Sequence, residues 1–229
     1  MSEWEANLEQ TSPVSARSTP GASLSALAYW FTKRLIDILG SALLLIILSP
    51  VFLVVAIAIW ADSGLPIIFR CERAGRFGQP IIVLKFRSMR DGSHHHLEEL
   101  LTNDKEHQLQ YGLNRKLRDD PRRTRVGAFL RRTSLDELPQ LVNVFTGQMS
   151  LVGPRPYFRH ELKGRPEATT IFRVRPGITG LWQVNGRSDR TFEERVAYDV
   201  AYVRKRSLAL DISIAARTFA AVISGRGAY

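Results

Sequence analysis

Residues 35–60 read LIDILGSALLLIILSPVFLVVAIAIW, an apolar run in which Asp37 is the only charged residue. A helix rises 1.5 Å per residue, so one straight helix of this length would cross the roughly 30 Å hydrocarbon core of a bilayer. Ser49 and Pro50 interrupt the run, and a proline inside a helix removes one backbone hydrogen bond and clashes with the preceding turn. The run therefore predicts a membrane-embedded helix with a kink at Ser49 and Pro50.

Basic residues flank this run on both sides, with Lys33 and Arg34 before it and Arg70, Arg73 and Arg76 after it. Because the cytoplasmic ends of membrane segments carry the basic residues, both ends are expected on the same side. The parts before and after Pro50 would be helices roughly 22 Å and 15 Å long, and neither alone crosses the bilayer core. A re-entrant helix and a single kinked span are both compatible with this geometry.

The chain divides into three predicted segments. Residues 1–28 are rich in Glu, Ser, Thr and Pro, which predicts a disordered tail. Residues 29–62 hold the membrane segment, and residues 63–229 form a cytoplasmic domain that is long enough for one core. The single cysteine, Cys71, excludes an internal disulfide and fits a reducing compartment.

The net charge of +10 and a pI near 10.2 indicate an anionic partner. That partner could be nucleic acid, an anionic membrane surface or a phosphorylated substrate, so a membrane-anchored basic domain without enzymatic activity is the alternative to an enzyme. Residues 115–132 concentrate the cations, which suits anionic lipid headgroups. Aromatic residues do not alternate with these cations, as binding of single-stranded nucleic acid would require.

A β-hairpin is predicted for residues 66–89, around a glycine-bearing turn at residues 74–78. Lys85 and Arg87 alternate with apolar or small residues, so they share one face of the second strand. That face is either solvated or turned toward phosphate. Residues 191–224 have the apolar spacing of helices.

Residues 131–156 read RRTSLDELPQLVNVFTGQMSLVGPRP and place two adjacent carboxylates, Asp136 and Glu137, at a helix start. Ser134 and Glu137 match a capping box, while Pro139 favours Asp136 as the cap. In either case both carboxylates lie in the first helical turn, where free amides favour ionised carboxylates and phosphate. Arg131 and Arg155 could neutralise such a phosphate, together with a divalent metal. Ordinary helix capping is the alternative.

Three segments together resemble the bacterial sugar transferase family, the monotopic phosphoglycosyl transferases. They are TRVGAFLRRTSLDELPQLVNVFTGQMSLVGPRP at residues 124–156, KFRSM at residues 85–89 and GITGLWQVNGRSD at residues 177–189. The similarity extends from Lys33 to the C-terminus. It implies a mainly helical α+β fold, in which a re-entrant membrane helix broken at Ser49 and Pro50 precedes a β-hairpin and a small helical catalytic domain.

The resemblance also implies an activity. The expected reaction transfers a hexose 1-phosphate, often galactose, from a UDP-sugar to undecaprenyl phosphate, releases UMP and begins exopolysaccharide assembly at the cytoplasmic face of the bacterial inner membrane. Asp136 would be the nucleophile that carries the phosphosugar, and Glu137 would bind Mg²⁺. The other implied site residues are Arg131, Arg155, Lys85 and Arg87 on phosphate, with Asn185 and Arg187 in a substrate loop. An anionic bilayer and a second copy of the chain are expected partners, and nucleic acid is not.

One position departs from the family pattern. The family usually has an acidic residue before MSLVGPRP, and this chain has Gln148. Any metal or arginine contact that the acid would make is therefore in question.

Overall fold

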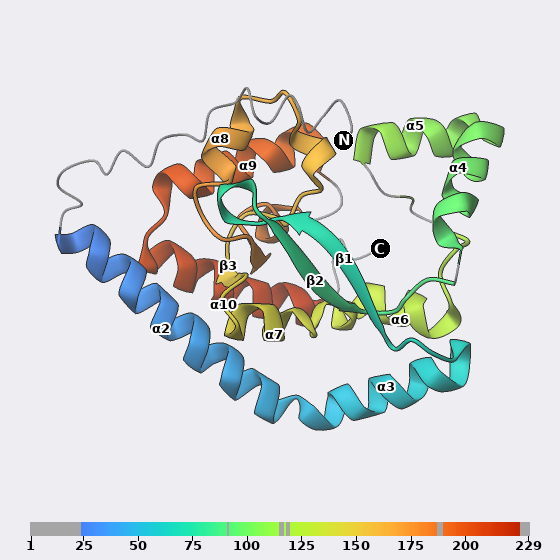
Figure 1. Ribbon diagram of the computed structural model, residues 1–229, viewed down its shortest axis with the longest axis horizontal. Coiled ribbons are helices and arrows are strands. Elements are labelled where there is room, and N and C mark those ends of the chain that lie inside the picture. Colours follow the sequence, from blue (N-terminus) through green and yellow to red (C-terminus); the bar gives the residue numbers. More distant parts are fainter. Residues whose placement is uncertain (1–23, 91, 115–116, 118–119, 187–189, 225–229) are drawn as a thin grey trace.

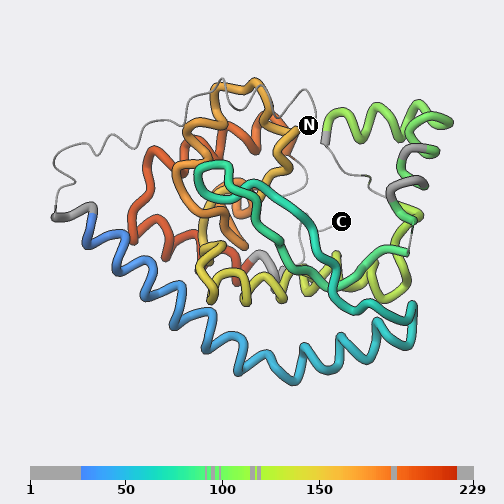
Figure 2. The backbone as a smooth tube through the Cα atoms, viewed as in Figure 1, coloured from blue at the N-terminus to red at the C-terminus, as the bar shows by residue number. Residues whose placement is uncertain are grey.

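The computed structural model describes residues 24–90, 92–114, 117, 120–186 and 190–224. Helices α2 (Leu24–Ile47) and α3 (Ser49–Ser63) form an open V along one edge of the molecule, bent by 61° (Figure 1). No single helix in these ranges is both long and apolar enough to cross a membrane, whereas the bent pair passes that test together, by length and composition. Figure 2 shows the rest of the chain on the concave side of the V.

The bend falls at the predicted residues. Pro50 lies in the first turn of α3, where its missing N–H removes no intrahelical hydrogen bond, and the hydroxyl of Ser49 donates to the carbonyl of Ile46 (2.8 Å). Helix α2 begins at Leu24, which is earlier than the predicted start at residue 29. Residues 1–23 of the predicted tail lie outside the described ranges.

The predicted hairpin is confirmed. Strands β1 (Ile68–Ala74) and β2 (Pro80–Phe86) pair antiparallel around the short 3-10 helix η1 (Arg76–Gly78). Phe69 lies opposite Lys85 at one end of the ladder, and Ala74 lies opposite Pro80 at the other. This register decides which later residues are near the carboxylates and which are not.

Helices make up most of the remaining chain, as predicted. The elements in chain order are α4 (Ser93–Asn103), α5 (Lys105–Asn114), α6 (Arg125–Thr133), η2 (Leu135–Glu137), α7 (Gln140–Phe145), β3 (Ser150–Val152), η3 (Arg159–Leu162), α8 (Glu167–Ile171), β4 (Gly177–Thr179), η4 (Gln183–Asn185), α9 (Phe192–Lys205) and α10 (Leu208–Ser224). Strands β3 and β4 pair in parallel, and α4 and α5 lie at the end of the molecule away from α8 and α9 (Figure 1). The mainly helical α+β class is therefore confirmed.

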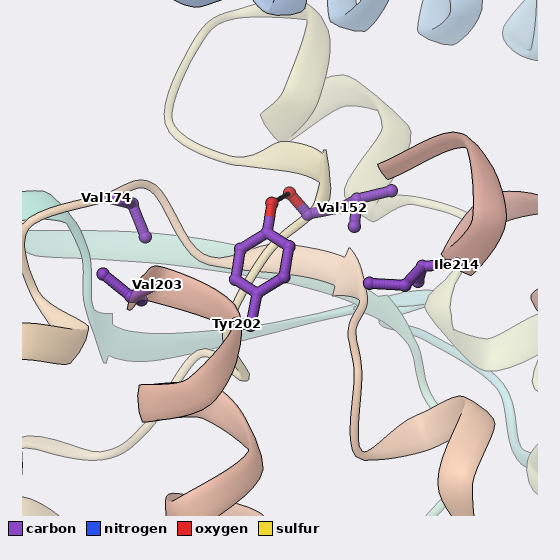
Figure 3. Packing of buried hydrophobic residues seen from close by; sticks show 5 residues of the cluster. All are labelled: Val152, Val174, Tyr202, Val203 and Ile214. Atoms are coloured by element: carbon purple, nitrogen blue, oxygen red, sulfur yellow. Dashed lines mark hydrogen bonds between the residues drawn. The ribbon is translucent and has the colours of Figure 1, made fainter. Parts of the chain in front are cut away.

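One apolar core joins β3 to the two C-terminal helices (Figure 3). Its buried members are Val152, Val174, Tyr202, Val203 and Ile214. The Tyr202 hydroxyl lies within hydrogen-bond distance of the Val152 carbonyl (3.1 Å) and of an Asp211 carboxylate oxygen (2.7 Å). These contacts satisfy the polar end of a buried side chain.

Buried polar contacts hold the first arm of the V to this body. Lys33 forms an ion pair with Asp211 of α10 (2.9 Å), and one Asp37 oxygen accepts hydrogen bonds from the Ser150 hydroxyl (3.0 Å) and the Leu151 N–H (2.9 Å). Asp37 is thus bound to β3, which presents a hydroxyl and an N–H beside it.

The second arm is held at its C-terminal end. Arg87, directly after β2, donates to the carbonyls of Ser63, Gly64 (2.7 Å) and Leu65 (2.8 Å). Asp62 accepts from the N–H of Val126 in α6 (3.2 Å). Both arms are thus attached to one folded body.

Candidate active site

The carboxylates Asp136 and Glu137 lie between two α-helices. Helix α6 ends at Thr133, and Ser134 follows in the left-handed conformation with φ of 59°. An N-cap residue has extended backbone angles, so the predicted capping by Ser134 is wrong. Asp136 and Glu137 form the 3-10 turn η2, which Leu138 and Pro139 separate from α7.

The N-cap of this region is Thr124, at the start of α6. Its hydroxyl oxygen accepts from the N–H of Gly127 (2.9 Å). This cap fixes where α6 begins. The N–H of Thr124 also donates to the Ser88 carbonyl (3.2 Å), so α6 starts against the chain that leaves β2.

Cations from two other elements meet the carboxylates. Lys85 of β2 forms an ion pair with Glu137 (2.7 Å), and both side chains are partly exposed. Asp136 is buried, with 7% of its surface exposed, and its charge acts on Arg131 of α6. The Arg131 guanidinium donates to the Ser88 hydroxyl (3.0 Å). Lys85, Ser88, Arg131, Asp136 and Glu137 are called the catalytic cluster below.

The pKa of Arg131 is lowered mainly by burial, while the charges of Asp136 and Asp120 oppose that shift. Asp120 is itself bound by Arg122, with a contact of 2.5 Å. Burial alone would raise the pKa of Asp120, but the hydrogen bonds and charge of Arg122 outweigh burial and leave the pKa below its ordinary value. The charges of Asp136 and Asp120 thus favour the charged form of Arg131, and Arg122 favours the charged form of Asp120.

Two of the predicted phosphate ligands have other surroundings. Arg87 is buried and caps the end of α3, although alternation would have placed it on the face of Lys85; β2 ends at Phe86, before Arg87. Arg155 lies 3.7 Å from Glu161, and its N–H donates to Asp199 (3.1 Å).

The register of the hairpin separates Arg155 from Lys85. The carbonyl of Tyr157 accepts from the N–H of Ala74, at the end of the ladder opposite Lys85. The five steps along the strand from Phe69 to Ala74 cover about 17 Å. The contacts of Arg155 therefore lie toward the far end of the hairpin, and its role on phosphate rests on the family resemblance.

The predicted substrate loop is described in part. The side-chain amide of Asn185 donates to the Leu181 carbonyl (2.7 Å), and its oxygen accepts from Arg217 of α10 (2.8 Å). These contacts tie η4 to α10. Arg187 lies outside the described residues.

Sequence reasoning missed Ser88, although the KFRSM segment contains it. A serine in a strand-like segment carries little signal by itself. Only the approach of α6 shows that its hydroxyl fixes Arg131.

A comparison with known sequences decides the family. The profile described as Bacterial sugar transferase matches residues 28–225. The chain belongs to the bacterial sugar transferase family.

Curated relatives in this family carry specific names. A UDP-galactose-lipid carrier transferase of Erwinia amylovora is 44% identical over 200 residues, which are 87% of this chain and 42% of that protein. The exopolysaccharide production protein ExoY of Sinorhizobium fredii is 43% identical over 199 residues, 86% of this chain and 88% of ExoY. A UDP-glucose:undecaprenyl-phosphate glucose-1-phosphate transferase of Escherichia coli is 42% identical over 194 residues, 80% of this chain and 38% of that protein. The chain thus spans less than half the length of the first and third of these relatives.

The unusual Gln148 has a structural partner. Its side-chain oxygen accepts from the amide of Asn143 (2.6 Å). Asn143 in turn donates to the Ile82 carbonyl (2.7 Å) and accepts from the Leu84 N–H (3.0 Å), which attaches α7 to β2. A carboxylate at position 148 would accept the same hydrogen bond, so glutamine preserves this contact of the usual acid.

The carboxylates suit one kind of metal binding. Within the described residues, no group of three or more His, Cys, Asp or Glu side chains could hold a metal ion by itself. Mg²⁺ in phosphoryl-transfer sites is commonly held by one or two carboxylates together with substrate phosphates. Glu137 would be the carboxylate that holds Mg²⁺ in this way, with substrate oxygens and water completing the shell.

Proposed function

We propose that this chain transfers a hexose 1-phosphate from a UDP-sugar to undecaprenyl phosphate, as the first step of exopolysaccharide or surface glycan assembly. The observation that carries the proposal is the catalytic cluster, in which a buried Asp136 lies beside Arg131 while Lys85 holds Glu137. The names of the relatives support the substrate class, since they specify UDP-galactose or UDP-glucose and a lipid carrier or undecaprenyl phosphate.

In the first half-reaction a carboxylate oxygen of Asp136 attacks the phosphorus that bears the sugar. A carboxyl–phosphate bond forms, the bond from that phosphorus to the bridging oxygen breaks, and UMP leaves with the electron pair. Arg131 and Lys85 lower the repulsion between the carboxylate and the phosphate oxygens. Lys85 and Ser88 also keep Glu137 and Arg131 in place, so little reorganisation is needed.

In the second half-reaction an oxygen of undecaprenyl phosphate attacks the same phosphorus. The carboxylate of Asp136 leaves with its electron pair, and the polyprenyl diphosphate sugar is released. Mg²⁺, held by Glu137 and phosphate oxygens, would supply additional neutralisation of the pyrophosphate charge.

The same structure supports a re-entrant position in the cytoplasmic leaflet. Large apolar side chains of α2 and α3 are exposed, which is not expected of core helices; they are Leu27, Phe31, Leu35, Ile36, Leu39, Leu43, Leu44, Ile46, Ile47, Leu53, Val54, Ile57 and Trp60. Lys33 and Asp37 attach one arm to the folded body, and Asp62 attaches the other. A single folded body cannot lie on both sides of a bilayer, so the V enters and leaves by the same leaflet.

Asp136→Asn tests the nucleophile, because it keeps the shape of the side chain and removes its nucleophilic oxygen. It is expected to abolish both lipid product and the protein adduct formed from a sugar nucleotide labelled at the β-phosphate. Glu137→Gln is expected to slow turnover while the adduct still forms at Asp136. Glu72→Gln, a change at an exposed carboxylate of β1, is the matched control and should keep wild-type turnover.

The kinetics should be ping-pong. An adduct that mass spectrometry maps to another residue, or an obligatory ternary complex, would falsify the assignment of Asp136. Wild-type protein without turnover on any sugar nucleotide, but with salt-sensitive nucleic-acid binding, would favour the non-enzymatic basic domain instead.

A further inference from the structure

A cavity of about 540 Å³ has Arg87 in its lining, the residue directly before Ser88 of the catalytic cluster. Its walls come from the end of α3, the chain after β2 and the start of α6, and its lining residues are Asp62, Ser63, Arg87, Arg90, Thr124 and Arg125. Among the described residues, this lining holds three arginines and one carboxylate, Asp62. Asp62 also accepts from the N–H of Val126, and one carboxylate cannot neutralise three cations. The cavity has the electrostatics of a site for a dianion.

One of these cations is built into the fold. Arg87 is 5% exposed and is fixed by the carbonyls of Gly64 and Leu65. Arg90 and Arg125 are exposed at the cavity and can turn toward a ligand. The site therefore combines one rigid guanidinium with two adaptable ones.

The cavity borders the surface that we assign to the membrane. Trp60 and Leu65, on either side of Asp62 and Ser63, are 62% and 70% exposed. Tryptophan with an exposed ring is typical of the level of lipid headgroups. An amphiphilic phosphate could thus place its headgroup among the arginines while its chain stays in the bilayer.

The cavity is also close to the reacting groups. Ser88, which binds Arg131, directly follows Arg87. Along α6, the six steps from Arg125 to Arg131 cover about 9 Å. A phosphate in the cavity is therefore within a short movement of the adduct on Asp136.

We infer that this cavity binds the phosphate monoester of the lipid acceptor before it attacks. This inference rests on the proposed function and deepens it. A monoester dianion matches the excess of guanidinium groups, whereas the described lining residues include no aromatic ring on which a nucleotide base could stack. Because each displacement at phosphorus is in line, the acceptor oxygen would attack from the side that UMP has left, and the cavity would hold the monoester near that position.

The two half-reactions separate this inference from the proposed function. Arg90→Gln and Arg125→Gln remove charge from exposed side chains and leave Arg87 and the fold in place. Each should raise the KM for undecaprenyl phosphate about fivefold, and the double variant more, by loss of charge-assisted contacts. Adduct formation and UMP release from the UDP-sugar should stay within about twofold of wild type. Arg204→Gln, at an exposed arginine of α9 outside the cavity, is the matched control.

Each other outcome overturns the inference. Slower adduct formation or a raised KM for the UDP-sugar would assign the cavity to the donor. An unchanged KM for undecaprenyl phosphate would leave the cavity without a role in acceptor binding. Competition by phosphatidylglycerol that equals that of undecaprenyl phosphate, and disappears in the double variant, would identify a general phospholipid headgroup site. Failure of the proposed function looks different, because the wild-type protein would then form neither adduct nor UMP.

Discussion

Gly127 allows α6 to approach the chain that leaves β2. A Cβ atom at this position would lie 2.0 Å from the carbonyl oxygen of Ser88, which is backbone and cannot rotate away. Gly127→Ala should therefore move α6, lengthen the contact between Arg131 and Ser88, and reduce adduct formation by at least tenfold. Rapid-quench measurement of the labelled adduct, with the melting temperature in detergent, tests this.

Gly112 provides the control for this change. It lies within α5, and a Cβ atom there would meet nothing within 4 Å. Alanine favours helix over glycine by roughly 1 kcal/mol, so Gly112→Ala should keep activity and hold or raise the melting temperature. Normal adduct formation by Gly127→Ala would show that the position of α6 is not needed for the chemistry.

Asp136 and Glu137 show how much of the candidate site the sequence alone predicts. The pair and the nearby arginines could be recognised, and Arg131 is indeed beside Asp136. The ion pair between Lys85 and Glu137 could not, because it joins the carboxylate to a strand residue 52 positions earlier. Ser134 was misread for a related reason: a capping pattern specifies residue types, whereas its φ of 59° is set by the turn that joins α6 to η2.

At the scale of elements, local patterns predicted well. The hairpin, the break at Pro50 and the two C-terminal helices all follow from periodicity and turn residues. What local patterns do not contain is the partner of a side chain across the fold. Asp37 binds β3 and Arg87 binds the end of α3, because tertiary packing brings unsatisfied N–H and carbonyl groups next to them.

The V of α2 and α3 gives a prediction about topology. In a Cys71→Ser background, cysteines placed at Phe31 and Leu65, which are 74% and 70% exposed, should both be protected from an impermeant thiol reagent added outside intact cells. Both should react once the membrane is permeabilised. The reason is that each arm is fixed to the same body, by Lys33 on one side and Asp62 on the other.

A control variant at an exposed residue of the folded body, Lys163→Cys, reports reagent leakage. Labelling from outside at either arm, without labelling at position 163, would contradict the re-entrant arrangement. Replacing Pro50 by leucine should straighten the helix and move some molecules toward a full span, which the same labelling would detect.

At the scale of the whole molecule, one buried acid connects the C-terminal helices to the segment that carries Arg155. Asp199 of α9 has 0% of its surface exposed and accepts from the Tyr157 hydroxyl (2.7 Å) and the Arg155 N–H (3.1 Å). Burial raises the pKa of Asp199 to about 7, although the hydrogen bonds from Tyr157 and Arg155 and the charges of Arg155 and Arg195 oppose the shift. The folded protein therefore keeps a proton that the unfolded chain loses near its ordinary pKa.

The sign of the pH dependence follows from that difference. Between the ordinary aspartate pKa of about 4 and the folded pKa of about 7, the folded state binds more protons, so the free energy of unfolding falls as pH rises and levels off above pH 7. A shift of this size corresponds to roughly 4 kcal/mol at most, or about 10 °C in melting temperature.

Asp199→Asn cannot titrate, so its melting temperature in detergent should vary less than that of wild type from pH 5 to 8. Glu193→Gln, at an exposed carboxylate of the same helix, should retain the wild-type dependence. Parallel pH profiles for wild type and Asp199→Asn would show that the loss of stability comes from other groups.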